Sequence, residues 1–287
     1  MASLAADPAL RHLLPEGAAL NEALARELGV LRWWNVALDK SARYRELRRR
    51  ADRLTGPSSA VAVGLRKRFF DEETRAAIEQ GAAQVLSLGA GLDGLCLRLA
   101  SRYPEVTFVE LDHPATQALK RSAVEKLGAG RPNLHLFPLD LQHQDLEAEL
   151  ARVAAWRTAA RSVVIAEGVL MYLDEPAVGR LLASIARICA PGSCFLFTYL
   201  AVPARERRAP LARFLALANR VTLRLRGEPY RWVVRAGDLE RVFAGQPYRL
   251  DRSPERCDLR RRYLEPEGLR DLAIGDAGAL AIAETIA

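Results

Sequence analysis

Two periods of hydrophobic residues alternate along the middle of the chain. Short apolar runs, typical of buried strands, are separated by longer segments in which apolar residues recur at helical spacing. The predicted strands are 84–88, 106–110, 134–139, 162–166 and 193–200, and the predicted helices between them are 95–102, 114–127, 146–156 and 175–189. Because a helix separates each pair of successive strands, the pattern predicts right-handed crossovers and an α/β fold with a doubly wound, mostly parallel sheet.

Upstream of this alternation the chain is predicted to be helical. Residues 18–36 repeat leucine at helical spacing, 40–54 form an arginine-rich amphipathic stretch, and 59–80 continue the helical pattern. Turn-forming residues at 55–58 interrupt it. We therefore expect residues 1–58 to form a helical N-terminal cap.

Downstream of residue 200 the pattern is less regular. Residues 209–226 and 238–243 read as helices, and segments 248–257 and 273–285 are predicted to add edge strands to the sheet. No internal repeat or low-complexity segment interrupts this part of the chain.

The basic residues are almost all arginines. The chain of 287 residues has a formal net charge of +7, and lysine occurs only at Lys40, Lys67, Lys120 and Lys126. This charge indicates either a solvated arginine-rich surface or a face that attracts an acidic substrate. Because no recognition helix or aromatic-interleaved strand accompanies it, nucleic acid is not an expected partner.

Composition also bears on compartment and metal binding. No apolar run approaches the roughly 20 residues that span a bilayer, so no membrane partner is expected. Residues 1–14 include Asp7, Arg11 and His12 and lack the basic start and apolar block of a secretory signal, which favours a cytoplasmic location. The four cysteines and four histidines show no metal-ligand spacing, so no metal site is expected.

A glycine-rich turn follows the first predicted strand. Gly89-Ala-Gly91-Leu-Asp-Gly94 has the spacing GxGxxG and leads into a helix, a context in which backbone can approach a nucleotide-type ligand. Glu110 and Asp112 end the next strand about 20 residues later, where a carboxylate accepts hydrogen bonds from ribose hydroxyls. These features suit an NAD enzyme and a methyltransferase equally well.

The next two strands distinguish these alternatives. Asp140 and Leu141 follow the third strand, at the place where a methyltransferase contacts adenine, and Glu167 follows the fourth. All of these acids are expected on one rim of the sheet. They would crowd an anionic pyrophosphate and would suit a sulfonium cofactor that carries a cationic amino group.

Five sequence blocks in the same order resemble the leucine carboxyl methyltransferase family, which includes bacterial polyketide O-methyltransferases. They cover roughly residues 60–200, and residues 1–55 and those beyond 200 contain no such block. The blocks are Arg66-Lys-Arg-Phe-Phe-Asp71, Val85-Leu-Ser-Leu-Gly-Ala-Gly-Leu-Asp93, Phe108-Val-Glu-Leu-Asp-His-Pro114 with Thr116, Gln117 and Lys120, Asp140-Leu141, and Ala166-Glu-Gly-Val-Leu-Met-Tyr-Leu173.

The resemblance implies a Rossmann-like class I methyltransferase domain over residues 59–287, with S-adenosylmethionine as cofactor and substrate-lid helices around 201–245. Arg66 would pair with the carboxylate of the cofactor, Asp112 would bind its ribose and Glu167 its methionine end. The implied cofactor-binding residues are Arg66, Gly89, Gly91, Asp93, Glu110, Asp112, Asp140, Leu141 and Glu167.

The chain departs from the family pattern at two places. Bacterial members often have Arg-Thr-Arg where this chain has Arg66-Lys67-Arg68. After Gly-Leu-Asp they usually have threonine or serine followed by arginine, whereas here Gly94 and Leu95 stand at these positions.

We expect methyl transfer to an oxygen of a small molecule or peptide, with secondary metabolism favoured, and a protein C-terminus stays open as an alternative acceptor. A carboxylate acceptor is already ionised at neutral pH and needs no general base, whereas a hydroxyl would need one. The candidate catalytic residues are Tyr172, Tyr199 and His113. His113 has the alternative role of a helix-start residue before Pro114, and Tyr199 of a packing residue.

Several alternatives stay open. An NAD-dependent oxidoreductase would share the glycine turn, although no Tyr-x-x-x-Lys pair occurs, and a catalytically inactive scaffold would share the fold. A nucleic-acid methyltransferase ranks last because an Asn-Pro-Pro-Tyr motif is missing. The residues that are candidates for a substrate lid or anchor are Trp33, Trp34, Tyr44, Arg231, Arg235, Arg261 and Arg262.

Overall fold

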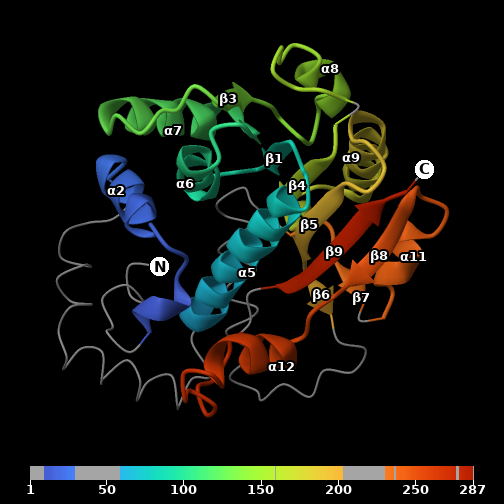
Figure 1. The fold of residues 1–287 in the computed structure, drawn as a ribbon. Coiled ribbons are helices and arrows are strands. Elements are labelled where there is room, and N and C mark those ends of the chain that lie inside the picture. Colours follow the sequence, from blue (N-terminus) through green and yellow to red (C-terminus); the bar gives the residue numbers. More distant parts are fainter. Residues whose placement is uncertain are drawn as a thin grey trace.

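A seven-stranded sheet forms the centre of the molecule (Figure 1). The computed structural model describes residues 10–29, 59–158, 160–202, 230–235, 237–275 and 278–286. In spatial order the strands are β3 (Leu134–Pro138), β2 (Thr107–Asp112), β1 (Gln84–Leu88), β4 (Ser162–Ala166), β5 (Cys194–Tyr199), β9 (Ala279–Thr285) and β8 (Tyr248–Arg252). The first five are parallel, and β9 runs antiparallel to both of its neighbours. The predicted mostly parallel sheet is therefore confirmed.

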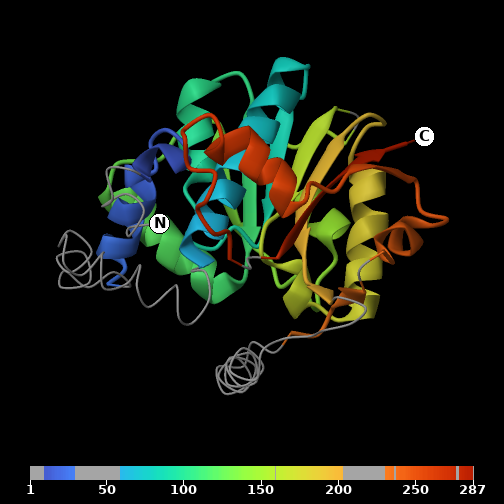
Figure 2. The same ribbon diagram turned by 90° about the horizontal axis from the view of Figure 1, so that it is seen from below.

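Helices cover both faces of this sheet, which explains why every residue of its central strands β1 and β4 is buried (Figure 2). One face packs against α5 (Ser59–Glu79) and α6 (Leu95–Arg102). The other packs against α8 (Leu146–Leu150), α9 (Glu175–Ile188) and α11 (Leu239–Phe243). Each crossover thus returns the chain to the same edge, so the carboxyl ends of β1 to β5 lie together.

The described part of the N-terminal segment lies on the α6 side of the sheet. It comprises a 3-10 turn, Arg11–Leu13, and α2 (Ala19–Glu27). Leu24 of α2 is fully buried against Leu97 of α6 and against Ala123 and Val124 of α7 (Pro114–Lys126). The predicted helix 18–36 ends at Glu27 within the described residues, because Gly29 adopts a positive φ of 66°. The remaining predicted cap, with the helix at 40–54 and the aromatic residues Trp33, Trp34 and Tyr44, lies outside the described residues.

Two predictions about element boundaries are corrected. The helix predicted at 146–156 ends at Leu150, and Trp156 instead lies in the following turns, where its indole N–H donates to the carbonyl of Ile188 at 3.3 Å. The C-terminal strand β9 is not an edge strand, because it pairs with β5 over six positions and also with β8.

The region after β5 contains short elements. Ala201–Val202 (β6) and Val234–Arg235 (β7) form a two-stranded parallel sheet, while the predicted helix 209–226 lies outside the described residues. The strand predicted over 248–257 ends at Arg252, and α12 (Arg256–Leu259) and a π-helical turn (Arg260–Leu264) follow.

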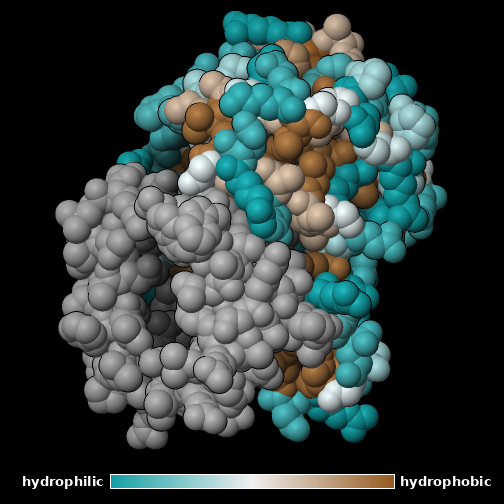
Figure 3. Space-filling model, turned by 90° about the vertical axis from the view of Figure 1, so that its left-hand side faces the viewer, coloured by the Kyte–Doolittle hydropathy of each residue, from teal (hydrophilic) through white to brown (hydrophobic). Residues whose placement is uncertain are grey.

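The surface is mixed in polarity. On the side that carries α2 and α7, polar side chains surround apolar ones (Figure 3). Leu119 of α7 and Leu127, which follows this helix, are exposed there. None of the helices in the described part of the chain is long and apolar enough to cross a membrane.

We predict that Phe197→Ala destabilises the fold by about 3–5 kcal/mol. Phe197 is fully buried in β5, and its ring stacks on Phe195 at 4.7 Å and contacts Phe243 at 5.6 Å, so its removal leaves a cavity between the sheet and α11. Urea unfolding followed by circular dichroism measures this. Leu119→Ala, at a side chain that is 57% exposed, is the control, with a change within about 0.5 kcal/mol. Equal losses in the two variants would contradict the assignment of the core.

Candidate functional site

The glycine turn after β1 lies at the carboxyl edge of the parallel strands. The Gly89 N–H donates to the carbonyl of Leu111 at 2.8 Å, which fixes the turn to β2. Gly89 and Gly91 have φ values of 60° and 52°, a region that glycine adopts without strain. A Cβ at Gly89 would also lie 2.5 Å from Val169, so the loop after β4 packs directly on the turn.

Asp112 holds the same turn from the end of β2. Its carboxylate accepts hydrogen bonds from the backbone N–H of Gly91 and, at 2.6 Å, from that of His113. The side chain is 8% exposed, so its position is set by backbone donors rather than by solvent. This places an ordered carboxylate next to the turn, where the sequence predicted a ribose-binding acid.

Glu167 follows β4 and receives two cations from α5. Its Oε1 lies 2.7 Å from Arg66 Nε and 3.0 Å from Lys67 Nζ. Its Oε2 is buried and has no hydrogen-bond partner among the described residues. A buried carboxylate oxygen without a donor costs free energy unless a ligand satisfies it. Glu167 therefore offers one acceptor for a cationic group.

Asp93 in the turn is bound from two directions. Its Oδ2 lies 2.8 Å from Lys67 Nζ, and its Oδ1 accepts from Asn21 Nδ2 of α2 at 3.1 Å. Burial alone would raise the pKa of the Asp93 carboxyl, but the charges of Lys67, Arg98 and Lys120 outweigh it and hold this pKa well below its usual range. Asp93 is thus ionised and shared between α2 and α5.

A second ion pair is buried beneath the turn. Lys120 Nζ of α7 lies 2.5 Å from Glu110 Oε2 of β2 and also donates to the carbonyl of Asp93 at 2.5 Å. Both side chains are 1% exposed or less. Burial raises the pKa of Glu110, against the opposing charge of Lys120. Glu110 therefore holds Lys120, which in turn donates to the backbone of the glycine turn.

Asp140 and Leu141 lie in the loop that follows β3. The Asp140 carboxylate accepts from the Gln142 N–H at 2.9 Å and lies 2.9 Å from His143 Nδ1. The hydrogen bond from His143 lowers the pKa of Asp140. Leu141 is half-buried against the sheet core.

The three candidate catalytic residues have different surroundings. Tyr172 ends the 3-10 turn Leu170–Tyr172 after β4, with its ring 5.7 Å from that of Tyr230. Tyr199 ends β5, is 8% exposed, and its hydroxyl lies 3.2 Å from Ser253 Oγ. His113 is exposed, and its Nδ1 accepts the Ala115 N–H at 3.4 Å as the N-cap of α7. The helix-start role considered for His113 is therefore observed.

The candidate substrate arginines lie on the surface. The side chains of Arg231 and Arg235 are exposed, and that of Arg261 is 74% exposed. Arg262 pairs with Glu72 at 2.8 Å and with Glu73 at 2.6 Å. No cluster of three histidine, cysteine or acidic side chains able to hold a metal ion occurs in the described part of the chain.

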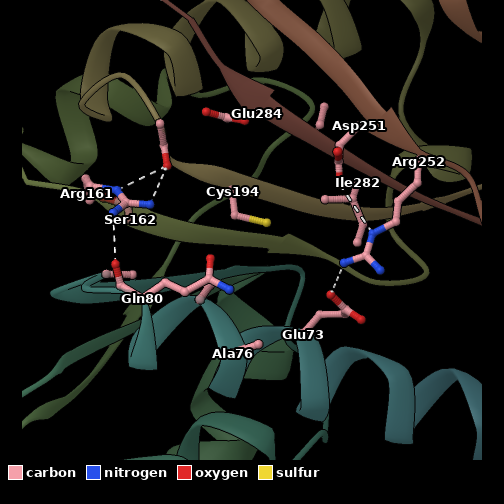
Figure 4. A pocket seen from close by; sticks show the side chains of 14 residues that line it. Glu73, Ala76, Gln80, Arg161, Ser162, Cys194, Asp251, Arg252, Ile282 and Glu284 are labelled. Atoms are coloured by element: carbon pink, nitrogen blue, oxygen red, sulfur yellow. Dashed lines mark hydrogen bonds and ion pairs between the residues drawn. The ribbon is translucent and has the colours of Figure 1, made fainter.

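A separate pocket of about 300 Å³ opens at the other edge of the sheet, where β4 and β5 begin (Figure 4). Its charged side chains already have partners within the protein. Arg252 pairs with Glu73 at 2.5 Å, and Arg161 donates to the carbonyls of Gly192 and Gln80. The pocket shares no residue with the glycine turn.

A family model described as leucine carboxyl methyltransferase matches residues 4–186 of the chain. The chain belongs to the leucine carboxyl methyltransferase family. This confirms the resemblance given by the sequence blocks. It also corrects their extent, because the family match reaches back to residue 4, into the segment in which no block was identified.

The chain aligns with less than half of the length of the curated relatives that it matches. A protein from Parafrankia sp. (strain EAN1pec) is 37% identical over 133 residues, which cover 46% of this chain and 42% of the relative. A protein from Mycolicibacterium paratuberculosis (strain ATCC BAA-968 / K-10) is 38% identical over 133 residues, which cover 46% and 41%. Both are named putative S-adenosyl-L-methionine-dependent methyltransferases.

Solved structures establish the fold. One from Thermobifida fusca YX, named a putative methyltransferase, has a TM-score of 0.55 at 20% identity and covers 98% of both chains. An S-adenosylmethionine-dependent methyltransferase from Mesorhizobium loti has a TM-score of 0.52 at 19% identity and covers 74% of this chain and 96% of its own. The predicted Rossmann-like methyltransferase fold is confirmed.

The family of the chain and the names of its curated relatives support S-adenosyl-L-methionine as the cofactor. The residues present fit this molecule. Glu167 Oε2 is a buried acceptor without a donor, as an ammonium group would require, and the glycine turn has open space beside Gly91. Asp112 adds an ordered carboxylate at the adjoining strand end.

The structure adds three residues to which the sequence assigned no role. Lys67 and Lys120 form the ion pairs described above, and their position inside matching blocks of a lysine-poor chain is a signal that could have identified them. Asn21 lies 72 residues from Asp93 in the sequence, and no local pattern indicates this contact.

We predict that Lys67→Met destabilises the fold by about 3 kcal/mol near pH 7, because it leaves Asp93 without its closest cation. The pKa of Asp93 is lower in the folded than in the unfolded chain, so its contribution is present above its ordinary pKa and declines as pH falls below about 4. The pKa of Lys67 is raised, since Asp93 and Glu167 outweigh its burial, so the pair persists to alkaline pH.

Thermal unfolding at pH values from 3 to 8 measures this effect. The difference between wild type and Lys67→Met should be largest near neutral pH and shrink toward pH 3. Lys126→Met is the control, because its pair with Glu27 is exposed and should contribute less than about 1 kcal/mol. A Lys67→Met deficit that does not change with pH would contradict the ionic role of Lys67.

Proposed function

We propose that the protein binds S-adenosylmethionine at the carboxyl edge of its parallel strands and transfers the methyl group to an oxygen of a small acidic molecule or peptide. The observation that carries this proposal is the buried, unsatisfied Oε2 of Glu167 beside the glycine turn. An NAD cofactor carries an anionic pyrophosphate, and a buried carboxylate oxygen would repel it.

Each residue at this edge has a proposed role in binding. Glu167 accepts a hydrogen bond from the ammonium group of the cofactor, and Arg66 pairs with its carboxylate. Asp112 would accept hydrogen bonds from the ribose hydroxyls, while Asp140 and Leu141 would lie on either side of the adenine. The glycines of the turn allow the methionine portion to approach the backbone.

The bound cofactor would supply a methyl group on a positively charged sulfur, so that an O–C bond forms as the S–C bond breaks and S-adenosylhomocysteine leaves. The acceptor we favour is a carboxylate, because its pKa near 4 leaves it ionised and no base is required. The chain's own residues then align the acceptor and exclude water, with Tyr172 proposed to lie near the transferred methyl. The net charge of +7 favours an acidic acceptor. We further propose that this acceptor is a molecule of secondary metabolism and that the reaction takes place in the cytoplasm.

The surroundings of Tyr199 favour a carboxylate acceptor over a hydroxyl. Ser253 Oγ donates its only proton to the carbonyl of Leu280 at 2.7 Å, so it can only accept from the Tyr199 hydroxyl. Tyr199 is thereby held as a donor within the protein. His113 is exposed and its Nδ1 accepts from the backbone of α7, so neither Tyr199 nor His113 is preorganised as a general base.

We predict micromolar binding of S-adenosylhomocysteine in calorimetric titration, weakened about 10- to 100-fold in Glu167→Gln and in Asp112→Asn. Each substitution removes a charged acceptor at the cofactor site with almost no change in volume. Glu175→Gln, at an exposed acid that begins α9, is the matched control and should bind as wild type does. Binding of NAD(H) in a parallel titration, with none of S-adenosylhomocysteine, would overturn the proposal.

We also predict that a double variant His113→Ala, Tyr199→Phe keeps at least half of the wild-type rate with carboxylate acceptors. Because such acceptors need no general base, the rate should be flat between pH 6 and pH 9. The measurement is methyl transfer from labelled S-adenosylmethionine to a panel of carboxylic acids and phenols. A rate that falls with the loss of either side chain would favour a hydroxyl acceptor, and cofactor binding without turnover on any acceptor would favour a scaffold.

A further inference from the structure

A side chain of α2, which precedes the strands of the sheet in the sequence, contacts the glycine turn after β1. Asn21 of α2 donates to Asp93 Oδ1 at 3.1 Å, and its own Oδ1 accepts from the Gly94 N–H at 3.0 Å and from Arg98 Nη1 at 3.2 Å. One amide therefore satisfies the carboxylate at the end of the turn, the backbone that follows it, and an arginine of α6.

The lack of a side chain at Gly94 leaves room for the contact with Asn21. Gly94 is the N-cap of α6 and contributes no side-chain cap, unlike the serine, threonine or asparagine that helices favour there. A Cβ on Gly94 would lie less than 3.0 Å from Asn21 Oδ1. The amide of Asn21 thus occupies the space that a side chain at position 94 would need.

The position of α2 is itself set by the helices around the turn. Leu24, one helical turn beyond Asn21, is fully buried against α6 and α7, and Glu27 pairs with Lys126 of α7 at 3.0 Å. Gly17, just before α2, lies against the aliphatic part of Arg98. The packing of α2 on α6 and α7 therefore also fixes the position of the Asn21 side chain.

A continuous chain of contacts joins α2 to the acid with the open oxygen. Asn21 contacts Asp93 at 3.1 Å, Asp93 contacts Lys67 at 2.8 Å, and Lys67 contacts Glu167 at 3.0 Å. Any shift of Asn21 changes the hydrogen bonding of Asp93 and hence the position of the lysine that neutralises Glu167.

We propose that Asn21 is a positioning residue for cofactor binding, through which docking of α2 and binding of S-adenosylmethionine favour one another. This proposal rests on the proposed function, because it concerns the same site. Coupling of this kind is reciprocal, so the ligand stabilises the docked helix by the same factor by which the helix improves affinity for the ligand.

The test is calorimetric titration of S-adenosylhomocysteine into wild type, Asn21→Ala, Gly94→Ser and the double variant. Asn21→Ala should weaken binding about 5- to 20-fold because the turn loses its cap. Gly94→Ser should weaken it similarly because the new Cβ displaces the amide. The double variant should bind more tightly than either single variant, because the clash is gone and a serine hydroxyl can cap α6. If the loss of affinity in the double variant equals the product of the losses in the two single variants, the proposal is overturned.

A second measurement separates positioning from a purely structural effect. Hydrogen exchange of α2 amides should slow when S-adenosylhomocysteine binds to wild type, and this slowing should disappear in Asn21→Ala. Arg26→Ala, at a half-exposed side chain of the same helix, is the matched control and should behave as wild type. If wild type fails to bind S-adenosylhomocysteine, the proposed function fails. If wild type and Asn21→Ala bind it equally, only the present inference fails.

Discussion

The site depends on the compensation of buried charge around Lys67. Two carboxylates, Asp93 from the glycine turn and Glu167 from the end of β4, approach this one ammonium within 3.0 Å. Without the Lys67 ammonium, the carboxylates of Asp93 and Glu167 would repel each other at the carboxyl ends of β1 and β4. Arg66 adds a second cation at Glu167, so the cluster is close to neutral and still leaves one carboxylate oxygen open. That combination of neutrality and an unused acceptor makes the edge of the sheet suitable for a cationic ligand.

Local patterns predicted the parallel half of the fold well. Strands β1 and β4 are buried on both faces and therefore appear in the sequence as short, mostly apolar runs, and the acids of the rim follow the strands closely. The pattern of apolar residues did not show which strands pair with each other in the sheet. Segment 279–285 alternates alanine with larger residues, which fits an edge as well as an interior strand, and only the pairing of β9 with β5 placed it inside the sheet.

The supporting residues of the site were harder to predict for the same reason. Asp112 and Glu167 could be placed because strand ends converge by topology. Asn21 could not, because its role arises from the packing of α2 on α6 and α7, far away in the sequence. Glu110 was predicted to touch the ligand, but the structure directs it toward Lys120 beneath the turn. Glu110 and Asp112 are two residues apart and share one face of β2, so alternation along the strand could not distinguish them. They differ in their partners, because Glu110 pairs with Lys120 whereas Asp112 accepts from the backbone N–H groups of Gly91 and His113.

The burial of Lys67 and Lys120 also determines how the surface charge responds to alkali. These are two of only four lysines in the chain, so the positive charge that faces solvent is carried almost entirely by guanidinium groups. Guanidinium stays protonated beyond pH 12, whereas ammonium groups begin to lose their charge near pH 10. The isoelectric point of about 9.5 is therefore reached while the guanidinium groups are still fully charged. Individual arginines on the surface can thus still bind an anion at a pH where the net charge of the protein has fallen to zero.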